Sequence, residues 1–245
     1  MIRSFTYSAL VIRVRPSGES NRDAWFLTAE EGIIKATVFG GPKSKLRAYI
    51  APFHQGTLWI YHDPIRDSRK VTDFDVHFWR PGIRELYERS RIAISVLETI
   101  ISSHGGGGNW YEALKISSQT LDSLNSANEE CSMRIWLHFL WTWADLLGLK
   151  QDINRCDSCS CEAKSDGVLF FSNQEGILRC ANCVGENHNF QPIGAGARRW
   201  LNTVENLHPN YLNRYTLDNV SLTQARNLVT GIIAGALGKS PLIGF

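Results

Sequence analysis

Four cysteines in two close pairs are the residues of this sequence best suited to chemistry. Cys156 and Cys159 form one Cys-x-x-Cys pair, and Cys180 and Cys183 form a second after twenty intervening residues. This spacing is typical of a four-thiolate zinc site, in which each pair supplies two sulfurs to one tetrahedral ion. A closed shell of four thiolates leaves no coordination position for water or substrate. We therefore predict a structural zinc ion and not a catalytic one.

The alternatives for these cysteines are disulfides, a redox dithiol, an iron–sulfur cluster, or thiols without a shared role. Disulfides are disfavoured because the sequence shows no secretory signal and is long enough to do without them. A thioredoxin-like dithiol would sit in a β-α-β context, which is not visible here. Spacing alone does not separate zinc from an iron–sulfur cluster. Cys161 lies two residues after Cys159 and could replace it as a ligand, whereas we interpret His188 as a loop residue.

The segment between the two cysteine pairs is expected to run out and back as a hairpin. Residues 167–171 (Gly-Val-Leu-Phe-Phe) and 176–179 (Gly-Ile-Leu-Arg) are short strand-like runs, and the polar residues 172–175 between them favour a turn. Such a hairpin would return the second cysteine pair to the side of the first.

A second group of residues could bind phosphate. Lys43, Lys45 and Arg47 place three cations within five residues, and no acid lies among them. Lys and Arg neutralise phosphates and release counterions, an interaction that carries no information about base sequence. Further cations extend the patch if the surrounding residues fold into one barrel: Arg13, Arg15, Arg22 and Lys35. The alternative is an ordinary solvated basic loop.

Length and charge narrow the class of protein. A chain of 245 residues with 43% hydrophobic residues can bury a core and form one large or two to three small domains. Residues 1–80 contain 12 Lys and Arg against 8 Asp and Glu, whereas residues 81–245 contain 14 against 16. This asymmetry favours an acidic partner for the N-terminal third. No apolar run reaches membrane-spanning length, so we predict no contact with a membrane and, by default, a cytoplasmic protein.

The elements that must position the N-terminal cations are expected to be strands. Short runs rich in β-branched and aromatic residues, with Gly and Pro between them, occupy residues 7–14, 24–28, 33–39, 57–62 and 71–78. Five such strands suit a small barrel or sandwich, of which the five-stranded OB-fold barrel is one. Four aromatic residues are candidates for stacking on bases, although most of them are expected to fill the core: Trp25, Phe26, Trp59 and Tyr61.

After Pro81 the hydrophobic period becomes helical. We expect helices over residues 84–101, 110–124, 129–147 and 194–206, and a last helix that a capping-box pattern opens at Ser221. We interpret the run of glycines at 105–108 as a flexible link. The last helix is apolar around much of its circumference, so it should pack against the earlier helices.

The predicted fold class is therefore α+β. Residues 1–80 form a small β domain, for which a nucleic-acid-binding OB-fold barrel is one candidate, and residues 81–245 form a helical domain. The cysteine segment, at about 152–190, interrupts the helical domain as a zinc-finger-like insert.

No constellation for catalysis is evident. The sequence contains no Gly-x-x-x-x-Gly-Lys-[Ser/Thr] phosphate loop, and its seven histidines are scattered without a metalloprotease spacing. A zinc deaminase would need an open coordination position and a glutamate in a His-x-Glu motif, which does not occur. We therefore predict a protein that is not an enzyme.

These features, in this order, resemble the RecO family of bacterial recombination mediator proteins. The resemblance covers nearly the whole chain. Its most specific parts are residues 43–47 (Lys-Ser-Lys-Leu-Arg) ahead of Pro52 and Phe53, and the four cysteines. Other stretches that carry it are residues 9–19, 27–28, 32–36 and 147–149.

The resemblance implies a fold and a function, with residues 1–80 as an OB-fold nucleic-acid-binding domain. Proteins of this family bind single- and double-stranded DNA, anneal complementary strands, and act in DNA repair and recombination in the bacterial nucleoid. With RecR they help to load RecA on strands coated by single-strand-binding protein, whose acidic C-terminal tail they contact. Carried over by position, Lys43, Lys45 and Arg47 would contact phosphates, and the four cysteines would hold zinc. The neighbours of the phosphate contacts in the same site would be Arg13, Arg15 and Lys35.

Two departures from the family pattern matter. The segment after Phe39 carries fewer cations than in many relatives, which predicts a modest affinity for DNA. Some relatives lack the cysteines, so the metal is not essential to the activity of the family. The alternative functions are a zinc-ribbon regulatory factor, which would recognise one nucleic-acid sequence, and a protein-interaction scaffold, whose basic patch would bind a protein tail.

Overall fold

The computed structural model describes residues 3–40, 44–185, 189–238 and 240–241. The chain divides into two compact units, Met1–Ser126 and Ala127–Phe245. The first unit contains the barrel and the two helices that follow it, so it extends beyond residue 80, where we placed the end of the barrel domain. Among the described helices, none has the length and apolar character needed to cross a membrane.

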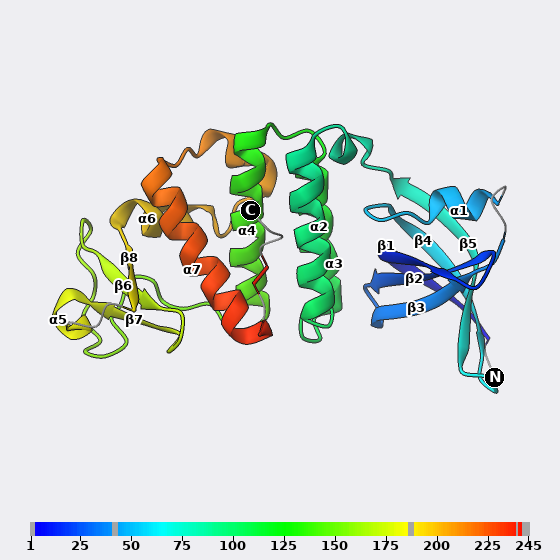
Figure 1. Ribbon diagram of the computed structural model, residues 1–245, viewed down its shortest axis with the longest axis horizontal. Helices are drawn as coiled ribbons and strands as arrows, with labels where there is room; N and C mark the ends of the chain where they lie inside the picture. Colours follow the sequence, from blue (N-terminus) through cyan, green and yellow to red (C-terminus); the bar gives the residue numbers. More distant parts are fainter. Residues whose placement is uncertain (1–2, 41–43, 186–188, 239, 242–245) are drawn as a thin grey trace. The chain divides into compact units, whose positions relative to one another are not determined.

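Five strands close into a barrel in the first unit (Figure 1). They are β1 (Ser4–Ser17), β2 (Asn21–Thr28), β3 (Gly32–Val38), β4 (Gln55–Asp63) and β5 (Ser68–Phe78). The order around the barrel is β1-β2-β3-β5-β4, and β4 pairs with β1. Strands β3 and β5 are parallel and join at one residue pair, Thr37 and Lys70, while the other pairs are antiparallel. This OB-fold-like barrel confirms the predicted fold.

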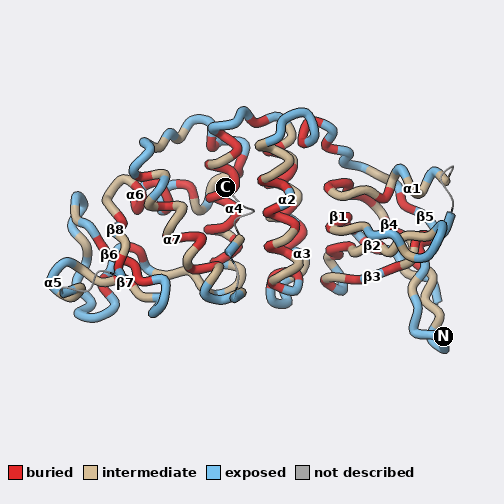
Figure 2. The backbone as a smooth tube through the Cα atoms, in the orientation of Figure 1, coloured by how far each residue is buried: buried red, intermediate tan, exposed pale blue. Residues whose placement is uncertain are grey.

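Buried and more exposed residues alternate along parts of the barrel strands (Figure 2). On β3, Ile34, Ala36 and Val38 are buried in the barrel core, whereas Lys35 between them is exposed. On β2, Phe26 is fully buried and its neighbour Trp25 is only half-buried. Because successive side chains of a strand point to opposite faces, the same alternation that fills the core also places cations on the outer surface.

Two helices pack on one side of this barrel. They are α2 (Tyr87–Ser102) and α3 (Trp110–Leu124), which contact each other and β1, and a 3-10 turn, η1 (Pro81–Arg84), precedes them. The glycine run between α2 and α3 is a packed turn and not the flexible link we expected. Gly105 is buried with a φ of 80°, and a Cβ there would lie 3.2 Å from Ile33 and 3.3 Å from Leu27. The close approach to the barrel therefore explains this glycine.

A short helix, α1 (Lys45–Tyr49), lies between β3 and β4 and contacts β5. We predicted a basic segment here but no helix. Its five residues are too few to form a stable helix alone, so contact with the barrel must stabilise it.

The second unit is built around α4 (Glu129–Leu146), which contacts α6 (Ala195–Val204), α7 (Asn219–Leu237) and a 3-10 helix, η2 (Pro209–Arg214). Trp136, Trp141 and Trp143 of α4 are fully buried, as expected for a core stripe. The predicted capping box at Ser221 is wrong. Asp218 is the N-cap of α7, and its Oδ1 accepts the Ser221 backbone N–H at 2.9 Å. A carboxylate is favoured there because it also faces the positive end of the helix dipole.

A small sheet carries the cysteine segment. Its strands are β6 (Leu169–Ser172), β7 (Ile177–Cys180) and β8 (Phe190–Ile193), in the order β7-β6-β8. The predicted hairpin is confirmed, since β6 and β7 pair antiparallel, with Leu169 opposite Cys180. The sequence analysis did not predict β8, which pairs with β6 and contacts α7. The sheet is thereby joined to the helical core of its unit.

Candidate metal centre and nucleic-acid interface

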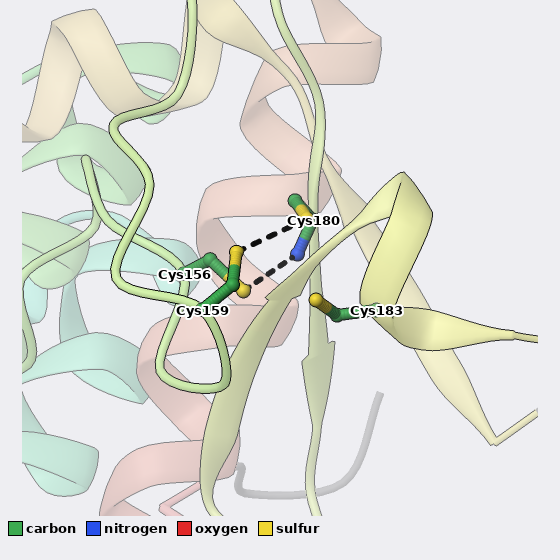
Figure 3. Close-up of side chains that lie close together, drawn as sticks. All are labelled: Cys156, Cys159, Cys180 and Cys183. Carbon is green, nitrogen blue, oxygen red and sulfur yellow. Dashed lines mark hydrogen bonds between the residues drawn. The ribbon is translucent and has the colours of Figure 1, made fainter.

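The structure brings the four predicted cysteine ligands together (Figure 3). Cys156 and Cys159 come from the loop before β6, Cys180 ends β7, and Cys183 lies in the short helix α5 (Ala181–Val184). Their Sγ atoms all lie within 4.8 Å of one another. We call these four residues the thiol cluster. The four cysteines that we selected by their spacing in the sequence therefore lie together in the fold.

The dimensions of the thiol cluster fit a tetrahedral ion. Zinc–sulfur bonds of about 2.3 Å place neighbouring sulfurs roughly 3.8 Å apart. The Sγ atoms of Cys159 and Cys180 are 3.8 Å apart. This one distance matches a tetrahedral site, and the four sulfurs are close enough together to hold a metal ion.

Backbone hydrogen bonds prepare the cluster for a cation. Burial raises the pKa of Cys156, but hydrogen bonds from backbone N–H groups outweigh burial and lower that pKa to about 6. One of these donors is the Cys180 N–H, 3.3 Å from the Cys156 Sγ. The pKa of Cys183 rises to about 12, chiefly through hydrogen bonds with the sulfurs of Cys159 and Cys180. A bound cation would favour the thiolate form of all four cysteines.

Asp157 joins the loop of the first cysteine pair to β7, a role that the sequence analysis missed. Its backbone N–H donates to the Leu178 carbonyl at 2.8 Å, and its Oδ2 accepts the Leu178 N–H at 2.6 Å. This reciprocal pair holds Cys156 beside Cys180 across the sheet. In the sequence, the only hint of this role is the position of Asp157 between the two cysteines of the first pair.

Cys161 lies outside the thiol cluster but close to it. It is exposed, and its Sγ accepts a hydrogen bond from the Cys159 thiol at 3.1 Å. The geometry therefore places Cys159 in the cluster and Cys161 at its edge.

The predicted cations of the barrel fall into two classes. Arg13 donates through Nη2 to both carboxylate oxygens of Glu98 on α2, at 2.7 and 2.9 Å. Lys35 forms an ion pair of 2.7 Å with Asp23. These two residues, which we expected to contact phosphate, are therefore already neutralised by carboxylates.

The remaining described cations have no such partner. None of Arg15, Arg22, Lys45 and Arg47 forms an ion pair with a carboxylate within the described ranges. We call these four residues the cation group. Lys43, the remaining predicted phosphate contact, lies outside the described residues.

Two members of the cation group lie close together. Arg22 Nη1 donates to the Arg47 carbonyl at 3.5 Å, so β2 and α1 meet at this point. Burial, followed by the positive charge of Arg47, lowers the pKa of the Arg22 guanidinium. Like charges held this close repel, and an anion between them would relieve the repulsion.

An aromatic ring and a cavity lie beside these cations. The Trp25 ring is 5.2 Å from Lys35 Nζ and 6.0 Å from the Arg15 guanidinium carbon. A cavity of about 410 Å³ is lined by Ile33, Ile34, Lys35, Ala36, Thr37, Asp67, Ser68 and Arg69. It opens beside β3, on the part of an OB-fold that commonly receives oligonucleotides. Lys35 thus lies both at the Trp25 ring and in the lining of the cavity.

Comparisons with known proteins agree with this picture. Residues 1–76 match the family model described as "Recombination protein O N terminal". Over 211 residues the chain is 26% identical to "DNA repair protein RecO" of Pelotomaculum thermopropionicum, which covers 84% of this chain and 78% of that relative. Over 206 residues it is 21% identical to "DNA repair protein RecO" of Maridesulfovibrio salexigens, with 81% of each covered. The likeness therefore extends well beyond the barrel.

Proposed function

We propose that this chain, which the family model and both relatives support as a member of the RecO family, is a DNA repair protein whose barrel holds nucleic-acid strands. The cation group is the observation that supports strand binding most directly. Its four cations lack a carboxylate partner among the described residues, and Arg22 lies against Arg47. A phosphate backbone is a polyanion that would neutralise them and release counterions.

The surface around the cation group suits a single strand. Trp25 offers a ring on which a base can stack, and Arg15 and Lys35 lie near it. Phosphate contacts from the cation group would carry no base-sequence information. The protein would therefore bind strands of any sequence.

From the family resemblance we extend the proposal to strand annealing. Two strands repel each other through their phosphates, and a basic surface that holds either one lowers this repulsion and raises the local concentration. No nucleotide hydrolysis and no bond cleavage are required. The proposed partners are RecR and the acidic tail of single-strand-binding protein, and RecA would be loaded as a result.

We also propose that the thiol cluster holds zinc as a structural ion. Cys156, Cys159, Cys180 and Cys183 would bind it, and it would cross-link the loop before β6 to the end of β7 and to α5. The size of the cluster and the four sulfur donors support this choice. The ion would take no direct part in the binding of strands by the barrel.

Charge removal in the cation group tests the function. The double variant Lys45→Gln, Arg47→Gln should bind a labelled single strand more weakly than wild type. The slope of log affinity against log salt should fall by about 1.4, since each phosphate contact contributes about 0.7. Fluorescence anisotropy between 50 and 200 mM salt, about the range over which such contacts are lost, measures both quantities.

A matched control is available in two cations that are already paired with acids. Lys115 forms an ion pair with Glu112, and Arg155 with Glu162. The double variant Lys115→Gln, Arg155→Gln removes the same charge and should keep the wild-type slope. An unchanged slope in the first variant would remove Lys45 and Arg47 from the proposed site, and a strong preference for one sequence would favour a regulatory factor instead.

A further inference from the structure

A cluster of aromatic rings lies at the end of β5, far along that strand from its single pair with β3 at Lys70. Trp79 is its centre. The indole makes T-shaped contacts with Tyr49 of α1, at a centroid distance of 5.4 Å, and with His54, at 5.0 Å. These contacts fix the plane of the ring, yet 44% of Trp79 stays exposed. We call Tyr49, His54, Trp79 and Arg84 the Trp79 cluster.

The backbone on both sides of the cluster is held in an uncommon conformation. Phe53 has a φ of 78° and Arg80 a φ of 49°, although neither is glycine. The two residues are joined directly, because Arg80 Nη1 donates to the Phe53 carbonyl at 2.7 Å. Arg80 is buried, and its guanidinium also binds Gln55 and Asp122. Left-handed residues persist only where their surroundings hold them, and they gather at ligand-binding sites.

The cluster is also positively charged. The Arg84 guanidinium lies over the Phe53 ring at 5.6 Å and donates to the Pro52 carbonyl at 3.0 Å. No carboxylate in the described part of the chain forms an ion pair with Arg84, whose side chain is exposed. Burial, together with the charges of Arg84 and Arg80, lowers the pKa of His54. These charges therefore act on His54, which contacts the exposed indole.

Helix α1 connects this cluster to the cation group. Lys45 and Tyr49 are four residues apart in α1, so they lie on the same face of the helix. Lys45 belongs to the cation group, and Tyr49 contacts Trp79. Helix α1 thus carries the exposed Lys45 one turn before Tyr49, which packs partly against the barrel core and contacts Trp79.

We propose that the Trp79 cluster binds an unpaired base of a single strand, which stacks on the Trp79 indole while Lys45 and Arg84 contact the flanking phosphates. This inference rests on the proposed function, because it continues the path of the strand from the cation group across α1. Stacking on an aromatic ring beside cations is how proteins bind single strands without sequence preference. Cations alone would suit an acidic peptide, and a ring alone would suit an apolar one, whereas a nucleotide uses both.

Substitution of Trp79 tests the site. With a labelled dT20 strand, Trp79→Ala should weaken binding by about 5- to 100-fold, as expected for the loss of one stacked base. Trp79→Phe should stay within about 3-fold of wild type because it keeps a ring. The affinity for duplex DNA should not change, since its bases are already paired. Thermal melts of each variant check that the barrel folds. If Trp79→Ala does not fold, Arg84→Gln tests the site through its salt slope.

The salt dependence separates stacking from charge. Trp79→Ala should keep the wild-type slope, whereas Arg84→Gln should lower it by about 0.7. Tyr87 is the matched control, because it is an aromatic residue of the same unit, is 81% exposed and forms no ring contact within the described ranges. Tyr87→Ala should bind dT20 as wild type does.

The outcomes distinguish this inference from the proposed function. If Trp79→Ala binds dT20 normally while Lys45→Gln, Arg47→Gln binds weakly, the Trp79 site is wrong and the proposed function stands. Equal losses on dT20 and duplex would also overturn it, since stacking requires an unpaired base. If the wild-type protein binds neither nucleic acid, both proposals fail.

Discussion

The thiol cluster and the cation group each gather charge of one sign, but they are built in different ways. The thiol cluster is complete within residues 156–183, and its sulfurs lie within 4.8 Å of one another. The cation group draws on β1, β2 and α1, and two further cations expected beside it, Arg13 and Lys35, are paired with acids instead. Short-range spacing therefore assembles the first site, whereas the second depends on which residues the barrel brings together.

The two regions also differ in what would satisfy them. The thiol cluster concentrates negative charge once its cysteines ionise, and a single small cation neutralises it. The cation group spreads positive charge over a surface, which only an extended anion can match. A closed structural site and an open binding surface are thus expected from the same chain.

Loss of one thiol should produce the largest effect. Cys156→Ser should reduce the bound metal from about one ion per chain to nearly none, because three thiolates bind zinc far more weakly than four. Metal analysis of the purified protein measures this. Cys161→Ser is the control and should keep its metal. The reverse result would move Cys161 into the ligand set, and metal in both variants would break the contrast between a closed site and an open surface.

Acid should weaken the second unit independently of its thiols. His138 of α4 is 5% exposed, and burial lowers its pKa to about 4 from an ordinary value of 6.5. The unfolded chain therefore binds a proton first as pH falls, and the stability present above pH 6.5 is lost progressively towards pH 4, by about 3 kcal/mol. Urea titrations at several pH values measure this loss.

The variant His138→Leu separates the histidine from the thiol cluster. It should show a shallower fall in stability over the same pH range, while acid-driven release of metal should be unchanged. If wild type and variant weaken in parallel, the thiolates and not His138 govern the acid response of this unit.

Removal of the Asp157 carboxylate should have a smaller effect on the metal. Asp157→Ala loses the acceptor for the Leu178 N–H, and such outer contacts are worth about 10- to 100-fold in metal affinity. Competition with a chelator of known affinity measures the change. Asp152→Ala is a suitable control, because Asp152 lies in the same segment and is not part of this pair. Equal affinities in wild type and Asp157→Ala would show that the sulfurs alone fix the site.

Release of the paired cation Arg13 should have the smallest effect on strand binding. Glu98→Gln removes the carboxylate that neutralises Arg13. If Arg13 then contacts phosphate, the salt slope for a single strand should steepen by about 0.7 and the affinity should rise slightly. Anisotropy across a salt series measures this. A slope equal to that of wild type would place Arg13 away from the path of the strand.

Much of the architecture could be predicted because it depends on local patterns. All five barrel strands occur where apolar runs between turn residues predicted them, and the helix predicted over 110–124 has those bounds in the structure. The start of the last helix was misread for a local reason. Asp218 and Ser221 both offer a cap, and the earlier residue prevails because its carboxylate reaches the Ser221 N–H.

The five strands, the main helices and the set of four cysteine ligands could be predicted from the sequence. Hydrophobic period and ligand spacing are local patterns that extend over a few residues. The tertiary structure was needed to tell which of the described cations are paired with a carboxylate and which are not. Arg13 meets Glu98 from 85 residues away, and Arg22 meets Arg47 from another element. The tertiary structure also shows that Trp79, which was not among the residues predicted to stack on bases, is exposed and contacts two other rings. Surface charge and exposure follow from the packing of distant segments, which no local pattern encodes.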